Sequence, residues 1–426
     1  MHTLIRPKIF WQAYIPIFLS FVTSRLILQT DLLMVSPLGE AATAAFAVPS
    51  KIMIIDSIVA IALGPVISIA ISRETSESVK CKLIASALGL TCLISCALTL
   101  IGLMIYPHFV SSIITNPVVE EMSQNAVFWM TLSIPIRMLI FVGGMCLFAC
   151  GEGKRVSKIY FITISLNALL DWLFIYTFSF GFVGAYLATV LVSTIELVWI
   201  LYLIVKKIRQ FPLGRVSVSF VCSLATKFGP EWVRLISWQL EGFAILAILA
   251  SQWDWFPALS LFGVSAEVTA LLTMPLVAMM RNVSMVLAEH YKGSDFFVAK
   301  QLLKSVTRDT VLAYIFIGML VFVIGMNFGP AIYKLDSDRL VWWNAFIPIF
   351  SISLPFFAYG SLVRGIYQAC GKFKEIASIE IVITWILFIP ALYYALTTQN
   401  PFVFFAILYG KEIIILSLLR FKFLHD

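Results

Sequence analysis

The sequence has few charged residues, and this scarcity is its most informative property. Charged side chains make up 12% of the 426 residues, whereas hydrophobic residues make up 61%. A soluble chain of this length would form two or three domains with charged surfaces, so the composition excludes that class. Apolar runs of about 20 residues, each long enough to cross ~30 Å of hydrocarbon as a helix, recur along the whole chain. They indicate a polytopic α-helical membrane protein.

Cysteine and histidine are also scarce, and neither is arranged for chemistry. The seven cysteines lie in predicted helices or on the predicted cytoplasmic side, so they form no external disulfide framework, and their spacing matches no metal site. The four histidines lie near chain ends or in predicted loops, and no Asp-rich metal motif or Ser/His arrangement occurs. We therefore expect no catalytic site, no cofactor and no enzyme activity.

Twelve apolar segments predict twelve transmembrane helices. The predicted helices cover residues 10–34, 45–71, 83–105, 123–149, 157–177, 181–205, 226–251, 259–288, 309–333, 341–369, 375–396 and 401–420. The N-terminal run is too long for the apolar core of a cleaved export signal, so we interpret it as the first membrane helix.

Lysine and arginine predict the orientation of these helices. They cluster at both termini and in the connections that follow even-numbered helices, whereas the opposite connections contain only Lys334 and Arg339. Positive residues mark the cytoplasmic side. We therefore expect a multi-pass protein of the cytoplasmic (inner) membrane with both termini in the cytoplasm. The net charge of +7 is then a topology signal and gives no reason to expect a nucleic-acid partner.

The chain divides into two similar halves. The basic stretch 206–225 is the longest predicted cytoplasmic connection, and it separates a bundle over 1–205 from a bundle over 226–426. Pro16 in the first helix corresponds to Pro230 in the seventh, and helices four and ten both end in Ala-Cys-Gly before a Lys-bearing turn. Six helices separate these pairs, so the two six-helix bundles share one orientation. Such parallel repeats usually enclose a substrate cavity.

Two acidic residues in apolar segments predict a cation site in the first bundle. An ionised side chain near the centre of a membrane helix costs roughly 2.5 kcal/mol or more, and acids kept there usually bind or release a cation. Asn167 and Asp171 share a helix face because they are four residues apart. Helical rise places Asp31 about 5 Å and Asp171 about 9 Å from the outer ends of their helices. The two carboxylates could share one proton or, with other oxygens, hold Na⁺; alternatively, Asp31 could cap the external turn.

Several stretches of the first half combine into signatures of a known transporter family. Asp31 is followed by Met34-Val35 and Leu38-Gly39, and Pro16 precedes it by fifteen residues. The stretches Asn167 to Asp171 and Gly184 to Thr189 add matching residues at matching spacing. Together they resemble helix one and helices four to six of the MATE transporters (multidrug and toxic compound extrusion). Looser matches in the second half are Pro230, Glu241, Phe243, Trp385, Pro390 and Gly410.

The resemblance implies a secondary antiporter that exports small organic compounds in exchange for a cation. It implies that Asp31, Asn167, Asp171 and Thr189 form the cation site, and that the first helix bends at Pro16. We expect H⁺ in preference to Na⁺, alternating access of the two bundles, and function as a monomer in the lipid bilayer. The alternative is a flippase or exporter of a lipid-linked or anionic metabolite from a related branch of the superfamily.

Charged residues elsewhere in the predicted helices bear on the substrate. Glu241 is a second candidate for coupling or for contact with a cationic substrate, and Arg234 lies on the same face and could pair with it. Lys51 could pair with Asp31, and Glu196 could pair with Arg137. Buried arginines must be paired or must face an anion, so Arg25, Arg137, Arg234 and Arg364 predict either structural ion pairs or an anionic substrate. No aspartate occurs in 356–363, which argues against a second Na⁺ site there.

Overall fold

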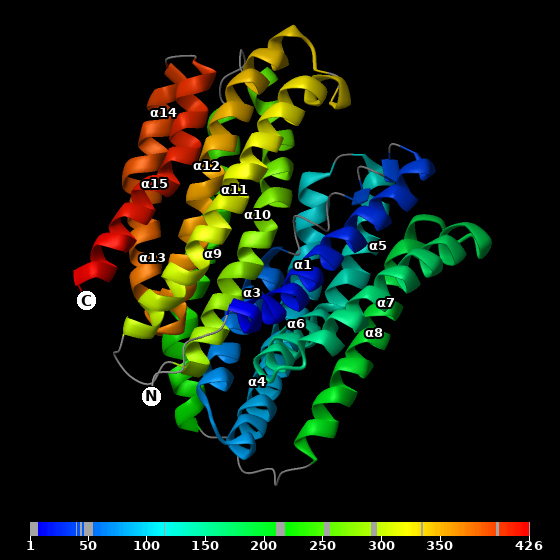
Figure 1. The fold of residues 1–426 in the computed structure, drawn as a ribbon. Coiled ribbons are helices and arrows are strands. Elements are labelled where there is room, and N and C mark those ends of the chain that lie inside the picture. The colour runs from blue at the N-terminus through cyan, green and yellow to red at the C-terminus, as the bar shows by residue number, and fades with distance from the viewer. Residues whose placement is uncertain are drawn as a thin grey trace. The chain divides into compact units, whose positions relative to one another are not determined.

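The computed structural model describes residues 7–39, 41–42, 45–46, 54–114, 116–209, 218–250, 256–290, 296–333, 335–397 and 400–425. These residues are nearly all helical, and the described ranges contain no strand (Figure 1). The chain forms two compact units, one over Gln12–Phe228 and one over Gly229–Asp426 together with Met1–Trp11. The two units are considered separately below.

The first unit contains the helices that carry the predicted cation site. They are α1 (Pro7–Val35) with the short turn η1 (Ser36–Leu38), α3 (Ile54–Arg73), α4 (Glu77–Ile113), α5 (Pro117–Leu132), α6 (Ile134–Ala149), α7 (Gly153–Trp172) with the π-helical segment η2 (Leu173–Thr177), and α8 (Gly181–Ile208). The predicted connection 206–225 is shorter than expected, because α8 continues to Ile208 and the next helix begins at Val218. Residues 210–217 of that connection lie outside the described ranges.

The fourth predicted helix, 123–149, is broken into two helices. α5 and α6 meet at Ser133 with a bend of 46°. Pro135 lies in the first turn of α6, where its missing N–H costs nothing, but it could not have continued the hydrogen-bond ladder of α5. The break is therefore a direct consequence of the proline.

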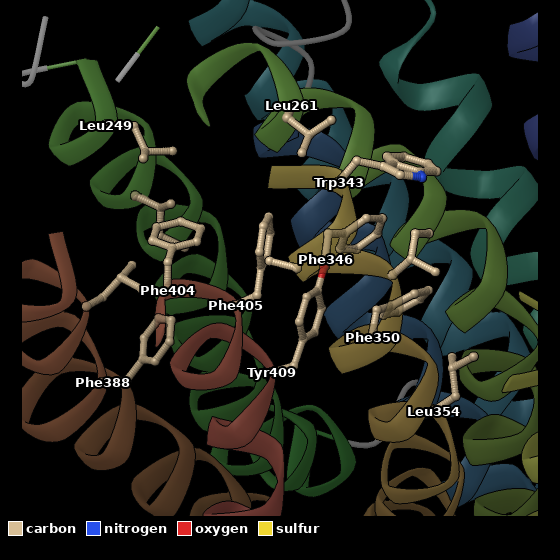
Figure 2. Packing of buried hydrophobic residues seen from close by; sticks show 14 of the residues in the cluster. Leu249, Leu261, Trp343, Phe346, Phe350, Leu354, Phe388, Phe404, Phe405 and Tyr409 are labelled. Carbon is tan, nitrogen blue, oxygen red and sulfur yellow. The ribbon is translucent and has the colours of Figure 1, made fainter. Parts of the chain in front are cut away.

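The second unit is built around α12. Its helices are α9 (Val218–Ala250), α10 (Phe256–His290), α11 (Phe296–Ile332), α12 (Ser337–Ala369), α13 (Phe373–Val382) with the π-helical segment η4 (Ile383–Phe388), α14 (Ile389–Thr397) and α15 (Pro401–His425). An aromatic core joins α12 to α15 (Figure 2). Phe350 lies 5.3 Å from Phe346 and 5.2 Å from Tyr409, measured between ring centroids. Close packing of this kind holds membrane helices together, because lipid offers no hydrophobic driving force between them.

Ten of the described helices are long and apolar enough to cross a membrane, and the bent α5–α6 pair makes an eleventh span. α1 is 29 residues long and contains the shorter apolar stretch Phe10–Thr23. With α1, the helices correspond one to one to the twelve predicted segments. Several extend further than predicted, since a helix can continue past the end of its apolar run.

The repeated Ala-Cys-Gly sequence adopts the same structure in both units. Gly151 after α6 and Gly371 after α12 have φ of 77° and 79°, a left-handed conformation that glycine adopts without steric cost. In each case the next residue donates its backbone N–H to the carbonyl five residues earlier, Glu152 to Leu147 and Lys372 to Tyr367, both at 2.9 Å. This is a Schellman ending. The sequence repeat thus encodes a repeated turn.

Candidate functional site

Asn167 lies between the carboxyl groups of Asp31 and Asp171. Its Nδ2 donates to Asp31 Oδ1 at 2.5 Å and to Asp171 Oδ2 at 2.8 Å. The hydroxyl of Thr189 contacts Asp31 Oδ2 at 3.3 Å and its own helix carbonyl of Ala185 at 2.9 Å. α1, α7 and α8 therefore bring the four predicted side chains together, and Asp31, Asn167 and Asp171 are all buried.

Helix periodicity and two close contacts position this cluster. Asn167 and Asp171 lie on the buried face of α7, while Leu169 and Trp172 point outward. Tyr176, in the π-helical segment that follows, donates its hydroxyl to the backbone carbonyl of Met34 at 2.6 Å and so joins α7 to the end of α1. A Cβ at Gly184 would lie 2.8 Å from the backbone of Phe174. Only glycine therefore lets α8 approach the π-helical segment this closely.

The two carboxyl groups lie on either side of one amide. Asp31 and Asp171 both accept from Nδ2 of Asn167, and two carboxylates held this close repel each other unless one of them carries a proton. Within the described ranges no lysine or arginine forms a salt bridge with either acid. Lys51, which was predicted as a partner of Asp31, lies outside these ranges. The cluster is thus a pair of buried acids with room for one shared proton.

Three further polar atoms at or near the cluster have no hydrogen-bond partner within the described part of the chain. They are Oδ1 of Asn167, Oδ1 of Asp171 and the hydroxyl of Tyr186, all buried. A buried polar atom left unpaired costs about 1–3 kcal/mol. Oxygen atoms of this kind suit a proton or a hard cation such as Na⁺. The described residues contain no group of three or more His, Cys, Asp and Glu side chains that could hold a metal ion.

Pro16 lies buried in α1, which continues through it as one helix. Its carbonyl oxygen accepts hydrogen bonds from the hydroxyls of Ser157 on α7 at 2.7 Å and of Ser20 at 2.9 Å. Proline has no N–H, so the carbonyl of Gln12 loses its helical partner. α1 is thus locally weakened at Pro16 and is held there by α7. Whether it bends at this position stays a prediction.

The predicted pairing of Arg137 with Glu196 is wrong. Arg137 instead forms a salt bridge with Asp56 on α3 at 3.0 Å, and it donates to the hydroxyl of Ser133 and to the carbonyl of Met130. The break at Ser133 leaves carbonyls at the end of α5 without helical partners, and Arg137 satisfies one of them. The side chain of Arg25 lies outside the described residues.

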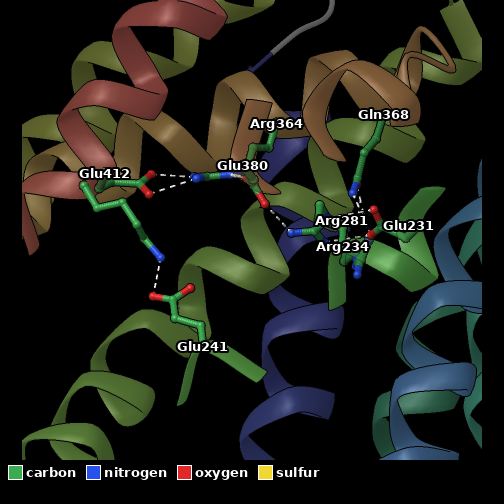
Figure 3. A network of polar contacts seen from close by, with 9 residues as sticks. Glu231, Arg234, Glu241, Arg281, Arg364, Gln368, Glu380 and Glu412 are labelled. Atoms are coloured by element: carbon green, nitrogen blue, oxygen red, sulfur yellow. Dashed lines mark hydrogen bonds and ion pairs between the residues drawn. The ribbon is translucent and has the colours of Figure 1, made fainter. Parts of the chain in front are cut away.

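The predicted pairing of Arg234 with Glu241 is also wrong. Arg234 forms two hydrogen bonds with Glu231, both at 2.9 Å, and one with Glu380 at 3.0 Å (Figure 3). Glu241 pairs with Lys411 of α15. Sharing a helix face did not make Arg234 and Glu241 partners, because each found a nearer charge on another helix.

These pairs belong to one alternating network in the second unit (Figure 3). Arg364 binds Glu380 at 2.5 Å and Glu412 at 2.5 and 2.8 Å. At the other end Gln368 donates to Glu231 at 3.2 Å and accepts from Arg281 at 3.2 Å. The network joins α9, α10, α12, α13 and α15. The sequence interpretation identified Arg234, Arg364 and Glu241 but missed the remaining members, which are Glu231, Arg281, Gln368, Glu380, Lys411 and Glu412.

Comparison with known proteins agrees with this architecture. Residues 16–173 match the MatE family model. A crystal structure of MATE in the bent conformation superposes with a TM-score of 0.83 at 18% identity, over 97% of this chain and 94% of that one. The MATE transporter VcmN of Vibrio cholerae in the bent form gives 0.87 at 16% identity, over 98% and 97%.

Over residues 16–173 the chain matches the MatE family model, and its fold is that of the MATE transporters. The predicted fold class, an all-α membrane protein of twelve helices, is thereby confirmed.

Two further proteins are similar to this chain at low sequence identity. The chain is 22% identical over 244 residues to the probable multidrug resistance protein YpnP of Bacillus subtilis (strain 168), a match that covers 57% of this chain and 54% of that protein. It therefore spans about half the length of that relative. A superfamily (MOP) transporter from Pyrococcus furiosus, described as having a binding pocket of reverse polarity, superposes with a TM-score of 0.80 at 20% identity, over 97% and 94%.

The part of the chain that matches the MATE model contains most of the acidic cluster. Residues 16–173 include Pro16, Asp31, Asn167 and Asp171, whereas Thr189 lies beyond the matched residues. The charged network of the second unit lies outside them entirely. Family likeness and site geometry therefore support each other in the first unit, and the second unit rests on its own contacts.

Proposed function

We propose that this chain is a cation-coupled antiporter that exports a small organic compound across the cytoplasmic membrane. The main support is the pair of buried acids, Asp31 and Asp171, which Asn167 bridges. Neither acid has a basic partner among the described residues. An acid pair of this kind changes charge only by taking up or losing a cation. The curated relative, a probable multidrug resistance protein, supports an organic substrate.

The bound cation acts on the link between α1 and α7. Asp31 is on α1, whereas its partners Asn167 and Asp171 are on α7. When the pair loses its proton, two negative charges face each other in a weakly solvated place and repel. This repulsion favours movement of α1 away from α7, and Pro16 supplies a point at which α1 can bend. The charge state thereby selects between two conformations, as antiport by alternating access of the two units requires.

The donors around the cluster favour H⁺ over Na⁺. Asn167 presents its N–H₂ group to both carboxyl groups, and a donor occupies positions that a metal ion would need for oxygen ligands. Asp31 and Asp171 accept from the same amide nitrogen, and a proton on one of them removes the repulsion between two carboxylates held this close. We therefore assign proton coupling to this site, with both termini in the cytoplasm and a monomer as the functional unit.

The flippase alternative gains no support from the basic residues. Arg137, Arg234, Arg281 and Arg364 each lie beside an acidic side chain. An arginine already paired is not available to an anionic headgroup without breaking that pair. The described residues thus favour the antiporter.

Transport in proteoliposomes tests the proposal. Asp31→Asn and Asp171→Asn each remove one ionisable group while keeping its size, so we expect both variants to fold and to lose proton-driven counterflow of a fluorescent organic cation. Asp338→Asn, at an exposed position, is the matched control and should transport like the wild type. Unchanged proton-driven counterflow in both cluster variants would contradict the proposal.

A further inference from the structure

The first unit has a small cavity between α5 and the start of α8. Its volume is about 260 Å³, slightly below the roughly 300–1,000 Å³ of pockets for drug-sized ligands. It is lined by Val118, Glu121, Met122 and Asn125 of α5 and by Phe180 and Phe182. In the predicted orientation the chain connections before α5 and before α8 both lie on the outer side. The cavity therefore has room for a small molecule at the outer end of this unit.

The local sequence fixes both walls of this cavity. The four lining residues of α5 are spaced i, i+3, i+4 and i+7, so they share one helix face. Asn116 caps α5, because its side chain accepts from the backbone N–H groups of Val118 at 3.0 Å and Val119 at 3.3 Å. On the other wall, the N–H of Phe180 donates to the carbonyl of Phe174 at 2.9 Å. The cavity is therefore preformed, and a ligand has little chain to order when it binds.

Glu121 places a negative charge in the cavity that no basic residue balances. Its neighbour Glu120 accepts a hydrogen bond from Gln124 at 3.1 Å, whereas Glu121 is exposed and has no hydrogen-bond or salt-bridge partner within the described part of the chain. Lysine and arginine are absent from the stretches of sequence that include the outer half of this unit, which are 26–50, 83–136 and 159–205. An unbalanced carboxylate in a concave apolar site attracts cations.

Aromatic rings form the opposite wall. Phe180 is 52% exposed, so its ring is accessible to a ligand, and it packs edge to face against Phe174 with 5.9 Å between ring centroids. Phe182 packs in the same way against Tyr186 at 5.2 Å. A cation over an aromatic face gains about 0.5–1 kcal/mol at an exposed site, and rings of this kind recognise quaternary ammonium groups. A carboxylate facing aromatic rings thus suits an organic ammonium ion.

The cavity lies near the acidic cluster but shares no residue with it. Phe182 and Thr189 are seven residues apart on α8, which is two turns or about 10 Å. Tyr186 lies between them along the helix and packs against Phe182. In the predicted orientation the cavity is therefore outward of Asp31 and its partners on the same helix.

We propose that this cavity binds a small organic ammonium group, with Glu121 as its counter-ion and Phe180 and Phe182 as its aromatic wall. A free cation outside the cell and the ammonium headgroup of an outer-leaflet lipid carry the same chemistry. The inference goes beyond the proposed antiport, because the cavity would bind such a group whether or not Asp31 and Asp171 exchange protons.

Site-specific alkylation of the purified full-length protein tests the site. Val118→Cys places a thiol at the rim of the cavity, since Val118 is 53% exposed, and mass spectrometry measures how fast a maleimide modifies that residue. We expect choline to slow the modification several-fold in detergent micelles. Its uncharged carbon analogue, dimethylbutanol, should leave the rate unchanged.

Three further variants in the Val118→Cys background assign the effect to this cavity. Glu121→Gln should abolish the protection by choline. The matched control Glu120→Gln, which changes the neighbouring acid outside the cavity, should retain it. Asp31→Asn should also retain it, because the acidic cluster does not line the cavity. Loss of proton-driven transport in Asp31→Asn would leave these rates unchanged, so the two proposals fail separately.

Lipid vesicles without added choline distinguish the two sources of the ammonium group. Slower modification in phosphatidylcholine than in phosphatidylglycerol vesicles would identify a lipid headgroup, whereas protection by added choline alone would identify a free cation. The proposal is overturned if neither choline nor phosphatidylcholine protects the thiol. It is also overturned if the protection survives Glu121→Gln or if dimethylbutanol protects as well as choline.

Discussion

At the scale of the residue, the first unit depends on a single amide. Asn167 donates its side-chain N–H groups to carboxyl groups on two helices, and no apolar side chain could form these two hydrogen bonds. Helix period places Asn167 beside Asp171, and acids are rare enough in this chain to be noticed, but the resemblance to the MATE transporters was needed to group these two residues with Asp31 and Thr189. The salt-bridge partners were harder to predict. Asp56 and Arg137 lie on different helices, and nothing in their spacing marks them as a pair.

Asn167→Leu tests the amide directly. The substitution removes two buried hydrogen bonds to acidic groups, so we expect a loss of about 1–3 kcal/mol in the free energy of unfolding. Unfolding in mixed detergent micelles measures it, with Asn125→Leu as the control because Asn125 is exposed. Equal stability of the two variants would show that Asn167 does not hold the acids.

Glu380 bridges two charged groups in the second unit, as Asn167 does in the first, because it forms salt bridges with both Arg234 and Arg364. Glu380→Gln leaves Arg234 and Arg364, which are 12% and 13% exposed, with less negative charge beside them. Breaking a fully buried pair typically costs about 3–5 kcal/mol. We expect the free energy of unfolding to fall by an amount near the lower end of this range, because Arg234 still pairs with Glu231 and Arg364 still pairs with Glu412. The exposed Glu267→Gln is the control, and the same unfolding measurement decides. A variant as stable as this control would mean that the network is not structural.

At the scale of the element, proline and glycine explain where the helices end and break. Pro135 divides the predicted fourth helix, and the sequence contained that signal, although the segment was expected to be continuous. No proline or glycine marks the start of α9 at Val218, eight residues before the predicted start at residue 226. Polar residues at the cytoplasmic end of a membrane helix can continue its hydrogen bonds in water, so hydropathy alone cannot locate the last turn.

The repeated turns give a prediction for both halves. Gly151→Ala and Gly371→Ala place a Cβ in a left-handed conformation, which costs roughly 1–2 kcal/mol. We expect each variant to lose stability by about this amount and by a similar amount in the two units. Gly89→Ala, inside α4 with open space around it, should instead be neutral or stabilising, because alanine favours helices. The prediction is contradicted if all three substitutions change the free energy of unfolding in the same direction.

At the scale of the whole molecule, the chain has the twelve-helix fold of the MATE transporters, and its two units balance the charges inside the helices differently. The first unit keeps acids without described basic partners, at Asp31 and Asp171 and again at Glu196. The second unit balances three buried acids, Glu231, Glu241 and Glu412, and the partly buried Glu380 against Arg234, Arg281, Arg364 and Lys411. Composition and helix period were enough to predict the fold. The charge balance required coordinates, because it depends on contacts between helices far apart in sequence.

The central claim is that Asp31 and Asp171 form a proton site, and titration of the purified protein without substrate tests it most directly. Tryptophan fluorescence, to which Trp172 beside Asp171 contributes, is followed against pH with and without Na⁺. The account predicts a pH-dependent transition in the wild type that is unaffected by Na⁺ and is lost in Asp171→Asn. A transition that persists in that variant, or that Na⁺ displaces, would contradict it.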